Sequence, residues 1–188
     1  AQDTATGLYQ LASAGLSAAD SQVVLQDTMK LAMATQGDHN TLAKLTTQTI
    51  MGFGFQMSDS GMLVDKFAHS IQKSLIEWQD LASSVKFAMP FFVATGQSID
   101  QLLGGLEVLT NRALEAGIAG RGLRQALAQF AKHANNNASA LAKMGVQIMD
   151  VNGEMRALHD IAKDAQVAFG DISGTEQLTA MLEDMNVR

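Results

Sequence analysis

Three glycines lie close together in the stretch "EAGIAGRGLRQAL", residues 115–127. A glycine-rich loop that opens a helix can bind phosphate, because its backbone N–H groups point at the anion. Here the order is G-x-x-G-x-G, helix-forming residues flank it on both sides, and no Lys-Ser or Lys-Thr pair follows. The pattern therefore favours a joint between helices. In this joint Gly117 ends one helix in the left-handed conformation, and Gly120 and Gly122 allow the next helix to approach closely.

The other residue types that do chemistry are scattered along the chain. The four histidines lack the paired spacing of a metal site; they are His39, His69, His133 and His159. Glu107 and Glu115, placed on one helix, would be about 12 Å apart, beyond the separation of a glycosidase acid pair. No G-x-S-x-G nucleophile elbow is present. We therefore expect no enzymatic activity, no catalytic residues, no metal and no cofactor.

The composition limits the classes of ligand. Of the 188 residues, 47% are apolar and 17% are charged, and the formal net charge is −6. The 13 lysines and arginines are dispersed, so we expect no specific nucleic-acid binding. The absence of cysteine excludes a disulfide framework and thiol catalysis. The most apolar run, residues 87–94, is far shorter than the roughly 20 residues of a membrane-spanning helix.

Helix-length amphipathic stretches alternate with glycines and with short polar residues that cap helices. This pattern predicts a mainly α fold, a multi-helix bundle of helix-turn-helix units. Residues 146–158 are the exception, because apolar and polar residues alternate there around an Asn-Gly pair, which is typical of a small β-hairpin. The predicted organisation is a helical core over 1–134, with units at 17–74 and 76–134, followed by a short helix, the hairpin and C-terminal helices over 135–188.

Particular residues mark the expected joints between these elements. Glycine in the left-handed conformation ends helices, serine caps their first turn, and a proline inside a helix bends it. One helix is expected over residues 99–116. The predicted structural joints are Gly15, Ser17, Pro90, Gly96, Ser98, Gly117, Gly120, Gly122, Asn152 and Gly153.

Two segments of the helical core resemble each other. "LQDTMKLAM" at 25–33 and "LASSVKFAM" at 81–89 share Leu, Lys, Ala and Met at the same steps. Duplication of a helix-turn-helix unit explains this similarity, and so does convergence of alanine-rich helices. Near the second segment, Pro90 with Phe91 and Phe92 is where we expect an exposed apolar ridge.

Four longer stretches follow one another in a distinctive order. They are "LYQLASAGLSAADS" (8–21), "FQMSDSGMLVDKFAHSIQKS" (55–74), "DLASSVKFAMPFFVATGQSIDQLLGGLEVLTNRALEAGIAGRGLRQALAQFAK" (80–132) and "LAKMGVQIMDVNGEMRALHDI" (141–161). Together they resemble the conserved core of tailed-bacteriophage tail tape measure proteins. That core has a capped A-G-[LIM]-S helix, a helix with a proline inside it, a glycine-rich joint before "LR", and a hairpin that begins with "L-G-V".

The resemblance implies a structural virion protein in the tail lumen, assembled in the bacterial host cytoplasm. Such a protein takes part in tail assembly, sets tail length and contributes to genome delivery. Its implied partners are further copies of itself, the tail tube, the tail tip or baseplate, and a tail assembly chaperone, with membrane contact only after ejection. A cell-wall-degrading or membrane-penetrating module of a tail protein is the alternative. Because the chain does not begin with Met, we expect a fragment of a longer protein.

Overall fold

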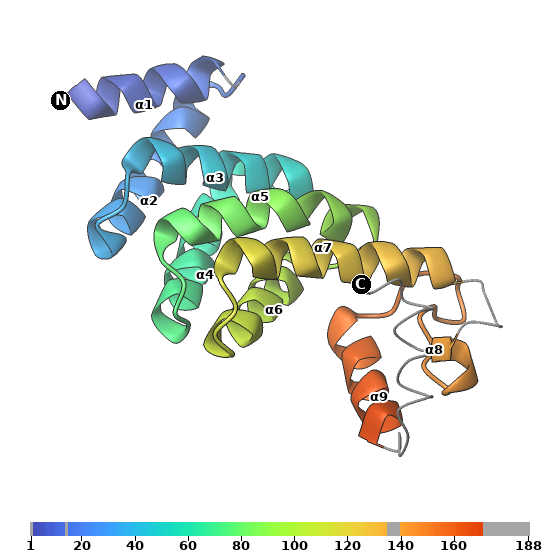
Figure 1. The fold of residues 1–188 in the computed structure, drawn as a ribbon. Helices are drawn as coiled ribbons and strands as arrows, with labels where there is room; N and C mark the ends of the chain where they lie inside the picture. Colours follow the sequence, from blue (N-terminus) through green and yellow to red (C-terminus); the bar gives the residue numbers. More distant parts are fainter. Residues whose placement is uncertain (1, 14, 135–139, 171–188) are drawn as a thin grey trace.

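The computed structural model describes residues 2–13, 15–134 and 140–170. These residues form helices joined by short turns (Figure 1). The elements are α1 (Gln2–Ser13), α2 (Ala18–Thr35), α3 (His39–Phe53), the 3-10 helix η1 (Met57–Asp59), α4 (Ser60–Lys73), α5 (Trp78–Ala94), α6 (Ile99–Asn111), α7 (Ala116–His133), α8 (Ala140–Lys143) and α9 (Leu158–Gly170). The prediction of a mainly helical fold is confirmed.

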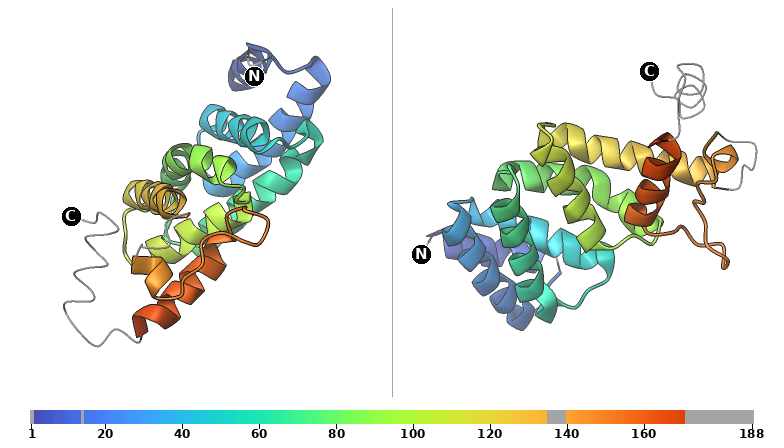
Figure 2. Two further views of the ribbon diagram at one scale, coloured as in Figure 1. Left: turned by 90° about the vertical axis from the view of Figure 1, so that its right-hand side faces the viewer. Right: turned by 90° about the horizontal axis from the view of Figure 1, so that it is seen from below.

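The first seven α-helices alternate between two layers. Odd-numbered helices lie side by side in one layer, where α3 contacts α1 and α5, and α5 contacts α7. Even-numbered helices form the other layer, where α4 contacts α2 and α6. Figure 1 and the left view of Figure 2 show the odd helices stepping along one side of the molecule and the even helices along the other. Each helix therefore packs against its neighbours in the same layer and has an outer face that points away from the other layer.

Helix ends are fixed by local side-chain and backbone chemistry. Ser17 accepts a hydrogen bond from the backbone N–H of Asp20 at 3.1 Å, and Ser98 forms a reciprocal capping box with Gln101. Such caps satisfy N–H groups that have no partner inside the helix. Gly15 and Gly96, with φ of +90° and +70°, turn the chain after α1 and α5. Short turns of this kind, which few residue types can make, lead the chain from one layer to the other.

One apolar core runs through both layers and reaches the C-terminal segment. Apolar residues at helical spacing point into it, as on α6, where Ile99, Leu102 and Leu106 are buried. Phe67 and Phe92 are among its largest fully buried side chains. Each such side chain contributes about 1.5–3 kcal/mol by burial. The sequence predicted an exposed apolar ridge at Pro90, Phe91 and Phe92. In the structure only Pro90 is exposed, whereas Phe91 is half-buried and Phe92 is buried.

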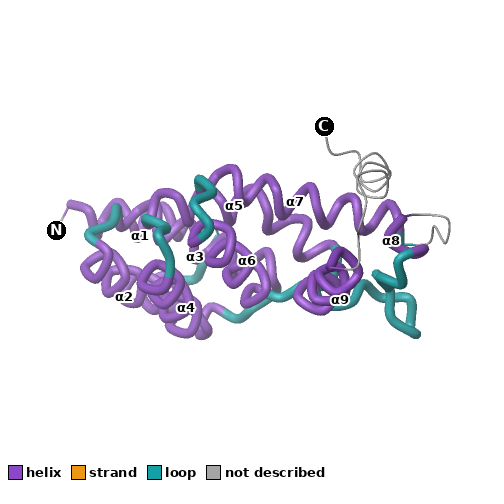
Figure 3. The backbone as a smooth tube through the Cα atoms, turned by 60° about the horizontal axis from the view of Figure 1, so that its bottom comes forward, coloured by secondary structure: helices purple, strands orange, loops and turns teal. Residues whose placement is uncertain are grey.

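The prediction of a two-stranded hairpin at 146–158 is wrong. The described residues there form turns and one isolated antiparallel bridge, between Met149 and Met155, and Figure 3 draws this segment as loop. The N–H of Val146 donates a hydrogen bond to the carbonyl of Leu141 in α8, and the Arg156 guanidinium donates one to the carbonyl of Gln147. Two backbone bonds flank the bridge, from the N–H of Asp150 to the carbonyl of Glu154 and from the N–H of Arg156 to the carbonyl of Ile148. Among the described residues this pairing extends no further, so no strand forms.

The predicted helix over 99–116 also ends earlier than expected. α6 stops at Asn111, and Ala113 adopts the left-handed conformation with φ of +66°. Because the residue that makes this turn is an alanine, no glycine marks the end of the helix in the sequence. Gly117 therefore does not end a helix; it lies in the first turn of α7.

Residues 140–170 are attached to the helical layers through Gln97, which is buried between α5 and α6. Its side-chain amide donates to the carbonyl of Arg156 at 3.0 Å and accepts from the N–H of Leu158 at 2.7 Å. Val146, Ile148 and Ile161 join the same apolar core. Of the C-terminal helices predicted within 135–188, the one expected over 175–185 lies outside the described residues. Within the described residues, no helix has the length and apolar character to cross a membrane.

Candidate functional site

The glycine-rich stretch lies within α7, where that helix packs against α5. The two helices share the most extensive contact of any described pair, and we call it the α5–α7 seam. Gly120 is its closest point, because a Cβ added there would lie 2.7 Å from the carbonyl oxygen of Ser84 and 2.9 Å from its Cα. Real Cβ atoms do not approach backbone so closely. Glycine is therefore required at this position for close helix packing.

Ser84 adds a polar link to the same contact. Its buried hydroxyl lies 2.6 Å from the carbonyl oxygen of Ala116 on α7 and 2.7 Å from that of Asp80 on its own helix. Ala88 and Ala119 are fully buried small residues in the two helices. The seam thus combines small side chains, which let the backbones approach, with a hydrogen bond between them.

The N-terminus of α7 holds a carboxylate of its own. Glu115 caps the helix, and its two carboxylate oxygens accept from the N–H groups of Gly117 at 2.8 Å and Ile118 at 3.1 Å. A helix N-terminus favours an anion because its N–H groups are unpaired and its dipole is positive there. Glu115 occupies the place that a phosphate would take, so this glycine-rich helix start does not form a phosphate-binding loop.

Two arginines of α7 lie over aromatic rings of α5. The guanidinium carbon of Arg121 is 5.6 Å from the ring centre of Phe87, and that of Arg124 is 5.3 Å from the ring centre of Phe91. Arg121 also lies 4.0 Å from Glu115. Stacking of this kind holds a cation in place at an exposed site and contributes about 0.5–1 kcal/mol.

The remaining predicted joints lie away from the seam or on its outer side. Gly122 is exposed on α7, and a Cβ added there would meet nothing within 4 Å. Pro90 is exposed near the end of α5. Asn152 and Gly153 form the turn after Asp150, whose carboxylate accepts from the N–H groups of Asn152 and Glu154. Of the predicted glycine joints in α7, the structure places Gly120 against α5, whereas Gly117 lies against the Glu115 cap and Gly122 faces open space.

The histidines and glutamates do not assemble into a reactive centre. Among the described residues no group of three His, Asp or Glu side chains could hold a metal ion. His39 Nε2 lies 3.0 Å from the hydroxyl of Thr28, while both ring nitrogens of His133 are buried and have no hydrogen-bond partner among the described residues. Glu107 is on α6 and Glu115 is in the turn before α7, so they do not share a helix as the sequence suggested.

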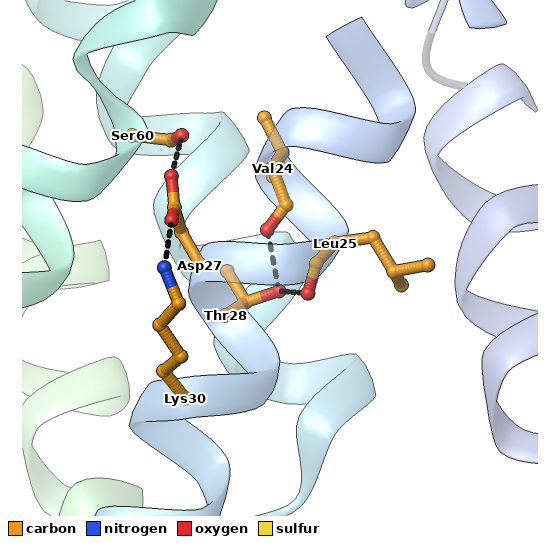
Figure 4. Close-up of polar contacts among 6 residues, drawn as sticks. All are labelled: Val24, Leu25, Asp27, Thr28, Lys30 and Ser60. Carbon is orange, nitrogen blue, oxygen red and sulfur yellow. Dashed lines mark hydrogen bonds and ion pairs between the residues drawn. The ribbon is translucent and has the colours of Figure 1, made fainter. Parts of the chain in front are cut away.

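A contact between α2 and α4 has no counterpart in the sequence motifs. Asp27 accepts from the hydroxyl of Ser60, the first residue of α4, at 2.7 Å and from Lys30 at 3.1 Å (Figure 4). Beside it, the hydroxyl of Thr28 bonds to the carbonyl of Val24 at 2.7 Å. The carboxylate therefore stabilises the positive end of α4 from a neighbouring helix. Asp27 and Ser60 are far apart in sequence, so no local pattern could have identified the pair.

Two carboxyl groups have lowered pKa values, and both act in turns. Asp38 caps α3, and hydrogen bonds from the side chain and the backbone of Thr41 lower its pKa. At Asp150 the N–H of Glu154 and then that of Asn152 lower the pKa. Each hydrogen bond favours the charged form. These shifts have structural causes, so they do not indicate a catalytic carboxyl group.

The even layer carries a surface groove between α4 and α6, which we call the α4–α6 groove. It encloses about 570 Å³. Its lining residues are Met62, Asp65, Lys66, His69, Asp100, Leu103, Gly104 and Glu107. Lys66 and Asp100 form an ion pair across it. The groove is open and mixed in character, so its geometry suits a contact surface more than a reaction.

Comparisons with known proteins agree with a structural role. The family model described as "Phage-related minor tail protein" matches residues 1–185. The chain is similar to the "Tape measure protein" of Pneumococcus phage Dp-1, with 24% identity over 94% of this chain and 15% of that protein. It is also similar to the "Probable tape measure protein" of Escherichia phage P2, with 25% identity over 90% of this chain and 21% of that protein. The chain thus spans about a fifth or less of these relatives. No solved structure matches it.

Proposed function

The chain belongs to the phage-related minor tail protein family as a region of the tape measure type, and we propose that it takes part in tail assembly and in the determination of tail length. The single observation that carries this proposal is the match of nearly the whole chain to two tape measure proteins of different phages. Length itself is set by the whole long protein. In this view the present segment is a compact, folded part of that protein.

The architecture supports such a role for the segment. Tightly packed alternate helices, held at the α5–α7 seam by Gly120 and Ser84, form a stable body with extended outer faces. Stacked helical layers of this kind offer long surfaces to other proteins. We propose as partners further copies of the chain, the tail tube, the tail tip or baseplate and a tail assembly chaperone. The proposed location is the tail lumen of the virion, with a contribution to genome delivery.

A deletion in the intact phage tests the proposal. Removing the codons of residues 2–170 in frame from the complete gene is expected to abolish or truncate tail assembly, because a folded assembly body is lost. Tail lengths are measured by negative-stain electron microscopy. The matched control is an in-frame deletion of equal length elsewhere in the same gene, expected to shorten tails in proportion. Infectious virions with tails of normal length after the first deletion would refute the proposal.

The proposed role is also non-enzymatic. Of the two glutamates that could act as acids, Glu115 is engaged in capping α7, and Glu107 lies at the edge of an open groove. We expect the purified chain to give no clearing in a peptidoglycan zymogram. Clearing that disappears in Glu107→Gln would instead support a cell-wall-degrading module.

A further inference from the structure

The outer sides of the two layers differ in charge. Among the residues of α3, α5 and α7 that are exposed, none is acidic, and the cations are Lys44, Lys86, Arg121, Arg124 and Lys132. The acids at this layer include the half-buried Asp80 of α5 and the cap Glu115 before α7. Within the described residues, four of these have no carboxylate within 4 Å, and Arg121 is at the limit. The part around Lys86, Arg121 and Arg124 we call the basic face. It is positive although the whole chain carries a net charge of −6.

The α4–α6 groove has the opposite sign. Asp65, Asp100 and Glu107 line it, and Lys66 is already paired with Asp100. Asp65 and Glu107 are therefore uncompensated. Met62, which is exposed, supplies apolar surface beside these carboxylates, and the buried Leu103 lies beneath it.

Two glycines in the middle of helices have no explanation inside the chain. A Cβ added at Gly104 on α6 or Gly122 on α7 would meet nothing within 4 Å, and neither has a positive φ. In contrast, Gly52, Gly105 and Gly120 are each packed against another helix. An exposed glycine within a helix costs about 0.5–1 kcal/mol relative to alanine. Gly104 lies in the groove and Gly122 lies beside Arg121 on the basic face, so each surface keeps a bare stretch of backbone where another chain could approach closely.

The cations of the basic face are already ordered for contact. Arg121 and Arg124 rest on Phe87 and Phe91, so less side-chain freedom is lost when they bind a carboxylate. Ile118 and Pro90, both exposed, surround them with apolar surface. Arginine, aromatic and apolar residues with few acids are typical of protein–protein contacts. Nucleic acid would require more phosphate contacts than these few cations offer.

We propose that a second copy of the chain docks its basic face on the α4–α6 groove of the first. The two surfaces belong to opposite layers of one molecule, so the contact is heterologous and each copy can bind one neighbour on either side. Lys86, Arg121 and Arg124 of one copy face Asp65 and Glu107 of the next, and Gly122 and Gly104 allow the helices to meet. This inference rests on the proposed function only because that function names other copies of the chain as partners. Its test uses purified protein, so it can fail while the proposed function in tail assembly still holds.

Charge-reversal variants of the 188-residue chain test this arrangement. The first variant carries Lys86→Glu and Arg124→Glu on the basic face, and the second carries Asp65→Lys and Glu107→Lys in the groove. Sedimentation velocity at 50 mM and 500 mM salt measures association of each protein, and circular dichroism checks that the variants stay folded. The wild type is expected to form species larger than dimers as its concentration rises, and less so at high salt. Each variant alone is expected to remain monomeric.

The mixture of the two variants gives the sharpest result. The first variant keeps an intact groove and the second keeps an intact basic face, and the two reversed surfaces also have opposite charges, so mixing two proteins that are each monomeric should restore association. A wild type that stays monomeric at 200 µM, or a first variant that associates as the wild type does, would overturn the proposal. Binding of the monomeric wild type to DNA or anionic vesicles, lost in the first variant, would assign the basic face to that ligand and overturn it as well.

A single substitution separates docking from folding. Gly104→Leu places a side chain in the groove at a position where an added Cβ would meet nothing within 4 Å, so the fold should be retained and association should weaken at least tenfold. If Gly104→Leu associates as strongly as the wild type, the groove is not the docking surface.

Discussion

The α5–α7 seam and the α4–α6 groove are both contacts between alternate helices, yet they are built in opposite ways. At the seam, Gly120 brings two backbones so close that no other residue fits. At the groove, Gly104 faces open space, and an ion pair between Lys66 and Asp100 joins the two helices. The same residue type within a helix therefore closes one contact and opens the other. The fold depends on the seam, and the surface available to partners is at the groove.

The strongest test of this difference is Gly120→Ala. The added Cβ would lie 2.7 Å from the Ser84 carbonyl, and the helices must separate to accept it. Overpacking of this kind typically destabilises a protein by about 1–3 kcal/mol. We expect a loss near the upper end, because the obstructing atoms are backbone. Urea denaturation followed by circular dichroism measures it, and a change below about 0.5 kcal/mol would contradict the assigned role of Gly120.

Ser84→Ala tests the polar part of the seam, with a smaller expected effect. The variant removes the hydroxyl that bonds to the Ala116 carbonyl but leaves the close approach unchanged. Loss of a buried hydrogen bond costs about 1–1.5 kcal/mol. The matched control is Ser83→Ala, an exposed neighbour on the same helix, for which we expect a change within about 0.5 kcal/mol. Equal effects of the two substitutions would show that the Ser84 bond contributes nothing.

A helix cap outside the seam and the groove shows how much a polar contact contributes to stability where no helices pack together. Asp38 caps α3, and Asp38→Ala is expected to cost about 1 kcal/mol at pH 7. Hydrogen bonds from Thr41 lower the pKa of Asp38 below its ordinary value of 3.8 in the folded state. The stabilisation is thus fully present above the unfolded pKa and is lost as the pH falls through the folded one.

Denaturation curves at several pH values test this expectation. The difference in stability between wild type and Asp38→Ala should shrink below about pH 4. Ser98→Ala removes an uncharged cap, and its cost should not change in the same way. A constant difference for Asp38→Ala down to pH 2 would refute the role of the carboxylate.

Much of the architecture could be predicted, because its signals are local in sequence. Ser98 and Gln101 are three residues apart, and apolar residues recur at helical spacing along α6. The missed features depend on residues distant in sequence or on atoms that no motif reports. Asp27 meets Ser60 only after α2 and α4 pack, and Ala113 ends α6 in a conformation usually taken by glycine. The Asn-Gly pair does form a turn, but the backbone pairing beside it stops at the single bridge between Met149 and Met155. The next residues back along the chain, Val146 and Gln147, bond to α8 and to a side chain instead.

The function of each glycine was the least predictable feature of the candidate site. Gly117, Gly120 and Gly122 lie within six residues, and the sequence pattern does not tell which of them is packed against another helix. In the structure the first is covered by its own cap, the second is pressed against α5, and the third is exposed. Their positions around the helix axis place the three glycines on different faces of α7, and the location of α5 decides which face is buried. That location follows from tertiary packing and not from the glycine pattern.

The smallest expected effect has the opposite sign and completes the comparison. Gly122→Ala and Gly104→Ala place a methyl group in open space and reduce the freedom of the unfolded chain, so each should stabilise the monomer by about 0.5–1 kcal/mol. Thermal denaturation at low protein concentration measures this gain, with Gly120→Ala as the destabilising counterpart two positions away from Gly122. If both exposed sites lose stability on substitution, then the bare backbone at Gly104 and Gly122 is needed by the fold itself. If both gain stability, the fold has no use for these glycines, and a reason for them must be sought at a contact with another molecule.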